Sequence, residues 1–313
     1  MSPTRPLRVA FLGNDAWSVP SLEALSASPH EVVLVATAEP KPAGRGNELT
    51  PTPVAEAARR LGAPLAEVES VTSGPGFKHL AVTAPDVLAV VAYGELLPPN
   101  VLNVPSIAPV NVHFSLLPSL RGASPVQTAL LLGAEVTGVT TIMMDHGLDT
   151  GGILFQREER IRRDDDAGSL GERLAMLGAQ VLVETIDHLS AGRVAPRPQD
   201  HSIATFAPKF TPQDRVLDWS NPARVLVNLV RALSPEPAAT TTLRGEGLKV
   251  FRAQEVGVEG EPGRIVEVTK DGFVIATAKG GFRPLEVAPA GRKRMSATEF
   301  ANGYRPQLGD TVG

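Results

Sequence analysis

The 313-residue sequence contains no cysteine, and only 4% of its residues are aromatic. The lack of cysteine excludes disulfides, thiolate metal sites and a cysteine nucleophile. So few aromatic side chains argue against a stacking surface for single-stranded nucleic acid. The first apolar run, Leu7–Leu12, is too short for a membrane span or a secretory signal. We therefore expect a cytoplasmic protein with no membrane partner.

Two nucleotide-binding patterns are also missing. The first expected strand is followed by Gly13-Asn14-Asp15-Ala16, with one glycine where the dinucleotide fingerprint needs three. No P-loop pattern occurs anywhere in the sequence. A net charge of −4 gives little support to nonspecific nucleic-acid binding. What the chain does have is 42% hydrophobic residues and a length that allows two domains, each with its own core.

Apolar, β-branched stretches recur through the first half of the chain and predict strands. They are Leu7–Leu12, Val32–Thr37, Val87–Ala92, Pro109–Val112 and Gly138–Met143. Stretches with helical character lie between several of them, at Pro53–Leu61 and Ser124–Leu132, and a longer helix is expected at Ser169–Leu189. Alternating strands and helices predict an α/β fold with a Rossmann-like, mostly parallel sheet that is covered on both faces.

The second half has a different pattern. Periodicity is lost after Ser190, so we predict a catalytic domain at 1–190, a linker at 191–210 and a second domain at 211–313. A helix is expected to start at Ser220-Asn221-Pro222. Short strands are predicted beyond it, at Leu248–Phe251, Arg264–Val268, Gly272–Ala278 and Phe282–Val287. Several short strands in about a hundred residues suggest a small OB-like β-barrel.

Asn111 and His113 lie two positions apart at the end of a predicted strand. Residues at i and i+2 of a strand point to the same side, so both side chains can face one small volume. An amide can stabilise a developing oxyanion, and an imidazole can move a proton near neutral pH. Either residue alone is more often structural than catalytic. Their spacing, at a strand end where ligands of such sheets bind, favours acyl transfer.

Asp149 is the third candidate. It lies in the Gly147–Gly152 segment after another predicted strand, and the glycines on both sides allow a tight loop. A carboxylate beside His113 would orient the ring and stabilise its charged form. The alternative is an Asp-rich turn at the surface, and sequence spacing leaves both open. His146 has no zinc-type ligand spacing around it, so we expect no metal.

The segment Pro40–Leu49 has a basic residue near its tip. It is either an arm that touches an anionic substrate or an ordinary exposed loop.

The motifs resemble those of known families. Asn111–Gly122 followed by Gly147-Leu-Asp149-Thr-Gly151 resembles the signature of folate-dependent formyltransferases. Within that group, Pro42-Ala-Gly-Arg45-Gly, Val90-Val-Ala-Tyr93-Gly94 and Leu285–Ser296 resemble the methionyl-tRNA formyltransferase family. The resemblance spans nearly the whole chain. The first motif is common to the superfamily, whereas the second domain is more specific.

The resemblance implies an activity and a site. The family transfers the formyl group of 10-formyltetrahydrofolate to the amine of methionine on initiator methionyl-tRNA, and tetrahydrofolate is the other product. By motif match the catalytic residues are Asn111, His113 and Asp149. The folate site would be lined by Ser115, Leu116, Leu117, Pro118 and Tyr93. The residues expected to bind tRNA are Lys41, Arg45, Arg292 and Lys293. We expect a monomer.

The sequence departs from the family pattern at two places, and two alternative functions stay open. Asn47-Glu48 stands where the family often has consecutive lysines, and Gly13-Asn14-Asp15 replaces the usual Gly-Thr-Pro. A formyltransferase that acts on a sugar nucleotide or on glycinamide ribonucleotide would keep the same trio but usually lacks the barrel. A non-catalytic RNA-binding protein is the alternative from another class.

Overall fold

The computed structural model describes residues 5–43, 47–270 and 272–313. The chain divides into two compact units, of which the first contains Met1–Pro125, Val136–Arg160 and Gly171–Ala207. The second unit contains Val126–Glu135, Ile161–Leu170 and Pro208–Gly313. The structure therefore assigns residues 191–207 to the first unit. The domain boundaries at 190 and 210 stay a prediction.

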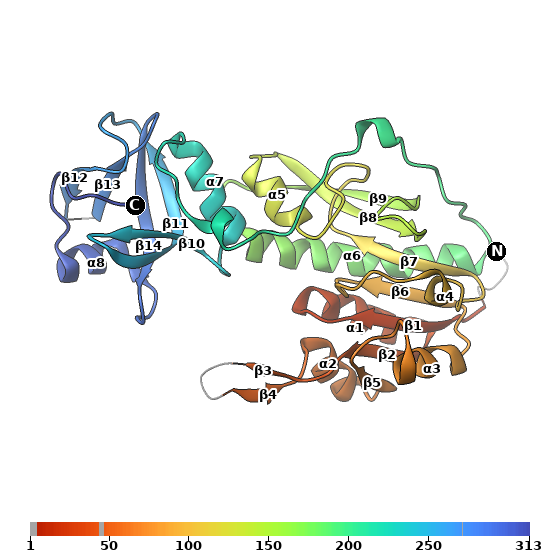
Figure 1. The fold of residues 1–313 in the computed structure, drawn as a ribbon. Helices are drawn as coiled ribbons and strands as arrows, with labels where there is room; N and C mark the ends of the chain where they lie inside the picture. The colour runs from red at the N-terminus through yellow and green to blue at the C-terminus, as the bar shows by residue number, and fades with distance from the viewer. Residues whose placement is uncertain (1–4, 44–46, 271) are drawn as a thin grey trace. The chain divides into compact units, whose positions relative to one another are not determined.

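The first unit is built on one sheet with the strand order β5-β2-β1-β6-β7-β8-β9 (Figure 1). The pairs from β5 to β7 are parallel, while β8 and β9 are antiparallel to their neighbours. The strands are β1 (Arg8–Gly13), β2 (Glu31–Ala38), β5 (Leu65–Val68), β6 (Val87–Val91), β7 (Ala108–His113), β8 (Val136–Met143) and β9 (Gly152–Arg160). The predicted Rossmann-like, mostly parallel sheet is confirmed.

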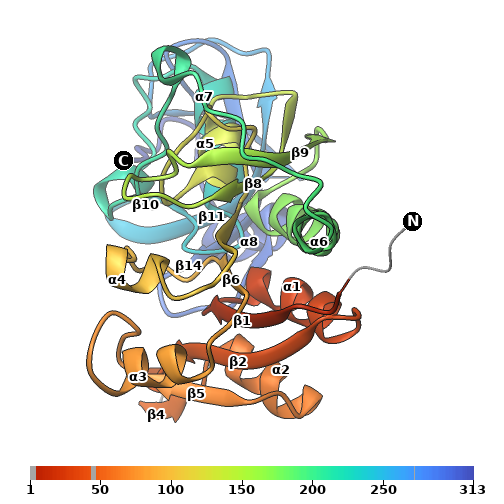
Figure 2. The same cartoon turned by 90° about the vertical axis from the view of Figure 1, so that its right-hand side faces the viewer.

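Helices cover both faces of this sheet. Alternate residues of the parallel strands, such as Leu12, Ala36 and Val90, form one core cluster with Leu80 of α3 and Val101 of α4. Figure 2 shows α1 and α6 on the opposite face of the sheet. The helices are η1 (Ala16–Ser18), α1 (Val19–Ser26), α2 (Pro53–Leu61), α3 (Gly74–Val82), α4 (Pro99–Leu102), α6 (Ala167–Ser190) and η2 (His201–Ile203). The first residues of α6 belong to the second unit.

Short or exposed elements escaped the sequence analysis. A hairpin of β3 (Lys41–Ala43) and β4 (Glu48–Thr50) occupies the segment expected to be a loop. All residues of β4 are exposed, so the segment has no apolar alternation from which a strand could be predicted. In β9 only Ile153 and Leu154 are buried and most of the last four residues are exposed, which also hides a strand pattern.

The second unit has an antiparallel sheet with the order β10-β11-β14-β13-β12, and β15 pairs with β14. Its strands are β10 (Ala239–Leu243), β11 (Glu246–Val256), β12 (Ile265–Thr269), β13 (Gly272–Ala276), β14 (Gly281–Pro289) and β15 (Met295–Ser296). Its helices are α5 (Pro125–Leu131, of which Pro125 lies in the first unit), η3 (Gln213–Arg215), α7 (Ala223–Leu233) and α8 (Ala297–Tyr304).

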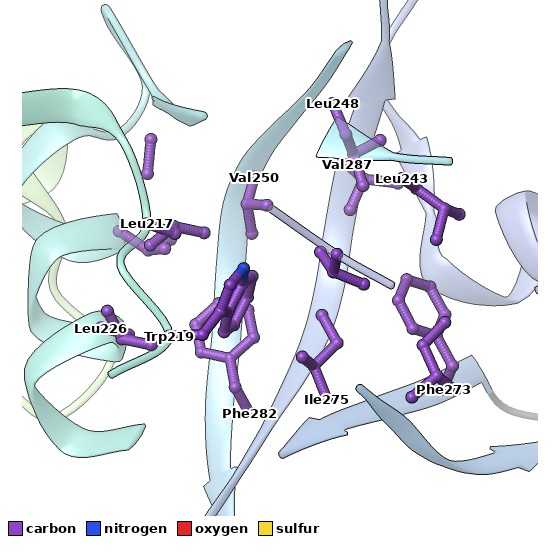
Figure 3. Packing of buried hydrophobic residues seen from close by; sticks show 14 of the residues in the cluster. Leu217, Trp219, Leu226, Leu243, Leu248, Val250, Phe273, Ile275, Phe282 and Val287 are labelled. Atoms are coloured by element: carbon purple, nitrogen blue, oxygen red, sulfur yellow. The ribbon is translucent and has the colours of Figure 1, made fainter. Parts of the chain in front are cut away.

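The segment 309–313 lies between the two edges of this sheet. Val312 forms a β-bridge with Leu243 of β10, and Thr311 forms one with Arg264, just before β12. The segment therefore links the first strand of the sheet to the last, as in a small barrel. Inside, the ring of Trp219 meets that of Phe282 edge to face, with centroids 5.3 Å apart (Figure 3). The predicted small C-terminal β-domain is confirmed.

Candidate active site

Asn111 and His113 end β7, which lies between β6 and β8. Val112 packs against Gly178 of α6, because an ideal Cβ on that glycine would lie 3.0 Å from the valine side chain. Successive residues of a strand point to opposite faces, so Asn111 and His113 face away from α6. Asn111 is half-buried and His113 is 5% exposed. An imidazole this deeply buried is held by its neighbours.

The structure brings Asp149 to His113. The Oδ2 atom of the carboxylate lies 3.6 Å from Nδ1 of the ring, and both side chains are mostly buried. Asp149 lies in the β8–β9 connection and has a left-handed backbone, with φ of 54°. Within the same loop, the Asp145 carboxylate accepts hydrogen bonds from the amide of Gly147 and the hydroxyl of Thr150. The alternative of a solvated surface turn therefore describes Asp145 better than Asp149.

Gly122 provides the second contact of the Asp149 carboxylate. Its amide donates to Oδ2 over 2.8 Å. At this position φ is +117°, and an ideal Cβ would lie 2.7 Å from the carbonyl oxygen of Ala207. Only glycine accommodates both the backbone angle and this close approach. Gly122 ends the motif that begins at Asn111, but the motif alone does not predict this contact.

The other ring nitrogen of His113 is also engaged. Nε2 lies 2.9 Å from the carbonyl oxygen of Leu120. A carbonyl oxygen only accepts hydrogen bonds, so Nε2 carries the proton in this contact. The opposite nitrogen faces the Asp149 carboxylate, which is also an acceptor. Both ring nitrogens therefore face hydrogen-bond acceptors.

The loop that follows β7 is expected to hold folate. Several of its main-chain groups form hydrogen bonds with side chains of β8 and β9. The amide of Leu117 donates to the hydroxyl of Thr140, which in turn donates to the carbonyl of Ser115. The side-chain amide of Gln156 donates to the carbonyl of Leu117 over 2.8 Å. Ser115 and Leu117 are buried, whereas Leu116 and Pro118 are half-buried. Leu116 and Pro118 are therefore the predicted folate residues with the more accessible surface.

Tyr93, the remaining folate candidate, is buried in the core cluster with α3 and α4 and is 6% exposed. Burial raises the pKa of its hydroxyl strongly, and the neighbouring Glu95 carboxylate adds to this effect. Its main-chain carbonyl accepts a hydrogen bond from the side-chain amide of Asn14. The binding role of Tyr93 stays a prediction.

Asn14 has a role that the sequence analysis did not assign. Its Oδ1 atom accepts from the hydroxyl of Thr37, over 3.0 Å, and from the amide of Ala38, over 2.8 Å. With the contact to Tyr93, one side chain joins the carboxyl ends of β1, β2 and β6. An asparagine directly after the first strand was the available signal, because amides often bond to nearby backbone.

A cavity of about 620 Å³ lies at the ends of β2 and β5, beside α3. None of the three predicted catalytic residues lines it. Its lining consists of Glu39, Glu67, Val68, Glu69, Ser70, Ser73, Gly74, Pro75, Gly76, His79 and Glu95.

The residues expected to bind tRNA are exposed where the structure describes them. Lys41 lies on β3, and Arg292 and Lys293 lie in the turn between β14 and β15. Their neighbour Arg294 pairs with Glu286 and lies over the ring of Phe251. Arg45 is outside the described residues.

No helix within 5–43, 47–270 and 272–313 is both long and apolar enough to cross a membrane. In the same part of the chain, no group of three or more His, Cys, Asp or Glu side chains could hold a metal ion.

Comparison with known proteins shows the family of this chain. The family model described as "Formyl transferase" matches residues 7–186, and that described as "Formyl transferase, C-terminal domain" matches residues 209–305. Methionyl-tRNA formyltransferase of Acidithiobacillus ferrooxidans is 41% identical over 312 residues, which are 99% of this chain and 100% of the relative. That of Bacillus licheniformis is 40% identical and covers 98% of both chains. The chain belongs to the formyl transferase family and, within it, to the methionyl-tRNA formyltransferases.

A solved structure shows the same fold. HypX from Aquifex aeolicus, in complex with tetrahydrofolic acid, matches with a TM-score of 0.69 at 17% identity. The match covers 97% of this chain and 48% of that one. The family resemblance inferred from the motifs is confirmed.

Proposed function

We propose that this enzyme transfers the formyl group of 10-formyltetrahydrofolate to the α-amine of methionine esterified to initiator tRNA. One observation carries this proposal. His113, which follows Asn111 by two residues on the same strand of a formyl transferase fold, lies 3.6 Å from the carboxylate of Asp149. The relatives of the same length carry the name methionyl-tRNA formyltransferase.

In the reaction the amine nitrogen bonds to the formyl carbon, and the formyl oxygen becomes an oxyanion. The tetrahedral intermediate then breaks its bond to the folate nitrogen, which takes up a proton as the amine loses one. Asn111 donates a hydrogen bond to the oxyanion. Removal of such a donor elsewhere costs roughly 3–4 kcal/mol of transition-state stabilisation.

His113 moves the proton. The Asp149 carboxylate beside Nδ1 stabilises the positive ring, and Nε2 exchanges its Leu120 partner for the reacting atoms. The ring then gives a proton to the departing folate nitrogen and takes one from the attacking amine. Such acid–base catalysis typically contributes about 10²- to 10⁴-fold in rate.

The two substrates are assigned to different surfaces. The folate donor would lie against the loop after β7, where Leu116 and Pro118 are the more accessible residues. The tRNA backbone would contact Lys41, Arg292 and Lys293, which are exposed and unpaired within the described residues. Arg45 is proposed for the same role from its motif. The predicted cytoplasmic location and monomeric state stay predictions.

The test is a formyl-transfer assay with 10-formyltetrahydrofolate and three acceptors: initiator methionyl-tRNA, glycinamide ribonucleotide and an amino-sugar nucleotide. Formylation of the tRNA alone supports the proposal. Formylation of only a small amine would keep the chemistry of Asn111, His113 and Asp149 but overturn the substrate. No product with any acceptor would favour a binding protein.

A further inference from the structure

Gln199 lies in the stretch that the sequence predicted to be a linker, yet it is only 6% exposed. Its Nε2 atom donates to the main-chain carbonyls of Asp149, over 2.8 Å, and Gly151, over 2.7 Å. These two carbonyls flank Thr150. One side-chain amide therefore holds the backbone of the Asp149 loop at two points.

Arg121 determines which way that amide points. Its Nε and Nη2 atoms donate to Oε1 of Gln199 over 3.2 and 2.6 Å. A guanidinium has donors only, so Gln199 must turn its oxygen to Arg121 and its NH₂ group to the carbonyls. Arg121 is 4% exposed, and its Nη2 also lies 3.0 Å from Nδ1 of His201. A hydrogen bond from its main-chain amide to the carbonyl of Thr205 fixes the arginine itself.

Asp149 needs this support. A left-handed backbone is disfavoured for a residue with a Cβ atom and persists only where the surroundings enforce it. The amide of Gly122 holds the carboxylate, while Gln199 holds the main-chain carbonyl of the same residue. The side chain is thereby aimed at Nδ1 of His113.

We propose that Gln199 and Arg121 are positioning residues of formyl transfer, which hold Asp149 at the distance from His113 that the reaction requires. The inference rests on the catalytic role proposed above for Asp149. Gln199 acts through the loop backbone, and Arg121 acts through the orientation of the Gln199 amide.

Gln199→Glu is the most informative variant, because it changes only the side of the amide that faces the Asp149 loop. Glutamate can still accept from Arg121, but it sets a carboxylate oxygen against the carbonyls of Asp149 and Gly151. We expect kcat to fall by about 10- to 100-fold, because small misplacements of catalytic groups have effects of this size. KM for the folate and the tRNA should change less than about threefold, because neither substrate's contacts are altered. Gln180→Glu, the same change at an exposed position of α6, is the matched control and should leave both constants unchanged.

A second variant covers the case in which the buried charge of Gln199→Glu prevents folding. Gln199→Met has similar length, removes the donor and adds no charge, so it should show the same loss of kcat. Circular dichroism and thermal unfolding establish that each variant is folded before kinetics are measured.

The decisive measurement combines either variant with Asp149→Asn. If Gln199 acts through Asp149, adding its substitution to Asp149→Asn causes little further loss. The single Gln199 variants should also change the pH profile of kcat in the same direction as Asp149→Asn. A folded Gln199→Met enzyme within threefold of wild type would overturn the inference and leave the proposed function intact. So would a full multiplicative loss in the double variant. A fully active Asp149→Asn enzyme would instead remove the proposed role of Asp149.

Discussion

In the first unit, polar side chains such as His113, Arg121 and Gln199 are buried and held by hydrogen bonds. In the second unit, the central core cluster is apolar, and the basic side chains of interest lie in an exposed turn. Catalysis on a small reacting centre needs polar groups fixed in place, and burial with satisfied hydrogen bonds fixes them. Contact with a large polyanion needs exposed positive charge on a stable scaffold. The two interiors fit the two tasks proposed for the units.

The strongest test of this contrast is His113→Ala. We expect kcat to fall by about 10²- to 10⁴-fold, the usual contribution of acid–base catalysis, with little change in stability. Steady-state formylation of methionyl-tRNA measures the effect. His146→Ala, an exposed histidine in the loop after β8, is the matched control. Near-normal turnover in folded His113→Ala enzyme would mean that the ring does not move the proton.

Trp219→Ala should lower the stability of the protein and leave its activity largely intact. The ring is 6% exposed and packs against Phe282, so its loss should lower the free energy of unfolding by about 3–5 kcal/mol. Calorimetry measures the loss, and turnover per folded molecule should be retained. Val225→Ala, at a position of α7 that is 42% exposed, should cost much less. Equal losses for the two variants would contradict the importance of the Trp219 core.

Removal of the exposed charges of Arg292 and Lys293 tests the role proposed for the second unit. In Arg292→Ala/Lys293→Ala we expect KM for tRNA to rise and kcat to stay nearly constant. Each lost phosphate contact should reduce the slope of log affinity against log salt by about 1. Binding of methionyl-tRNA across a salt series measures this slope. Arg224→Ala, an exposed arginine on α7, serves for comparison; an unchanged slope in the double variant would place the tRNA elsewhere.

The smallest expected effect concerns Asp86, the residue just before β6. Burial by itself raises the pKa of its carboxyl, but hydrogen bonds from the Arg8 amide and the Ser106 hydroxyl and the charge of Arg5 outweigh burial and hold it below the usual value. A depressed folded-state pKa stabilises the protein above the unfolded value, about 3.9, and this stability is lost as the pH falls through the folded value.

We therefore expect Asp86→Asn to lower Tm between pH 6 and 8, with the difference from wild type narrowing below about pH 4. Thermal unfolding at several pH values measures this. A difference that is independent of pH would show that the charge of Asp86 does not stabilise the fold.

Local patterns were sufficient for several features. The apolar runs of β1, β2 and β6, the helix α2 and the same-side placement of Asn111 and His113 depend on periodicity within a few residues. The motifs were specific enough to identify the family. The hairpin of β3 and β4 and the barrel-closing segment 309–313 could not be predicted, because their pairing involves exposed or isolated residues.

The site itself needed the tertiary structure. The sequence offered Asn111, His113 and Asp149 as candidates, but its spacing did not reject a solvated turn for Asp149. What places Asp149 beside His113 is the amide of Gly122 and the side chain of Gln199, which are 27 and 50 residues away in the chain. Local patterning can predict which way a strand residue points, since that is a property of the backbone. It cannot predict which distant donor meets a given acceptor, because that depends on how the whole first unit folds.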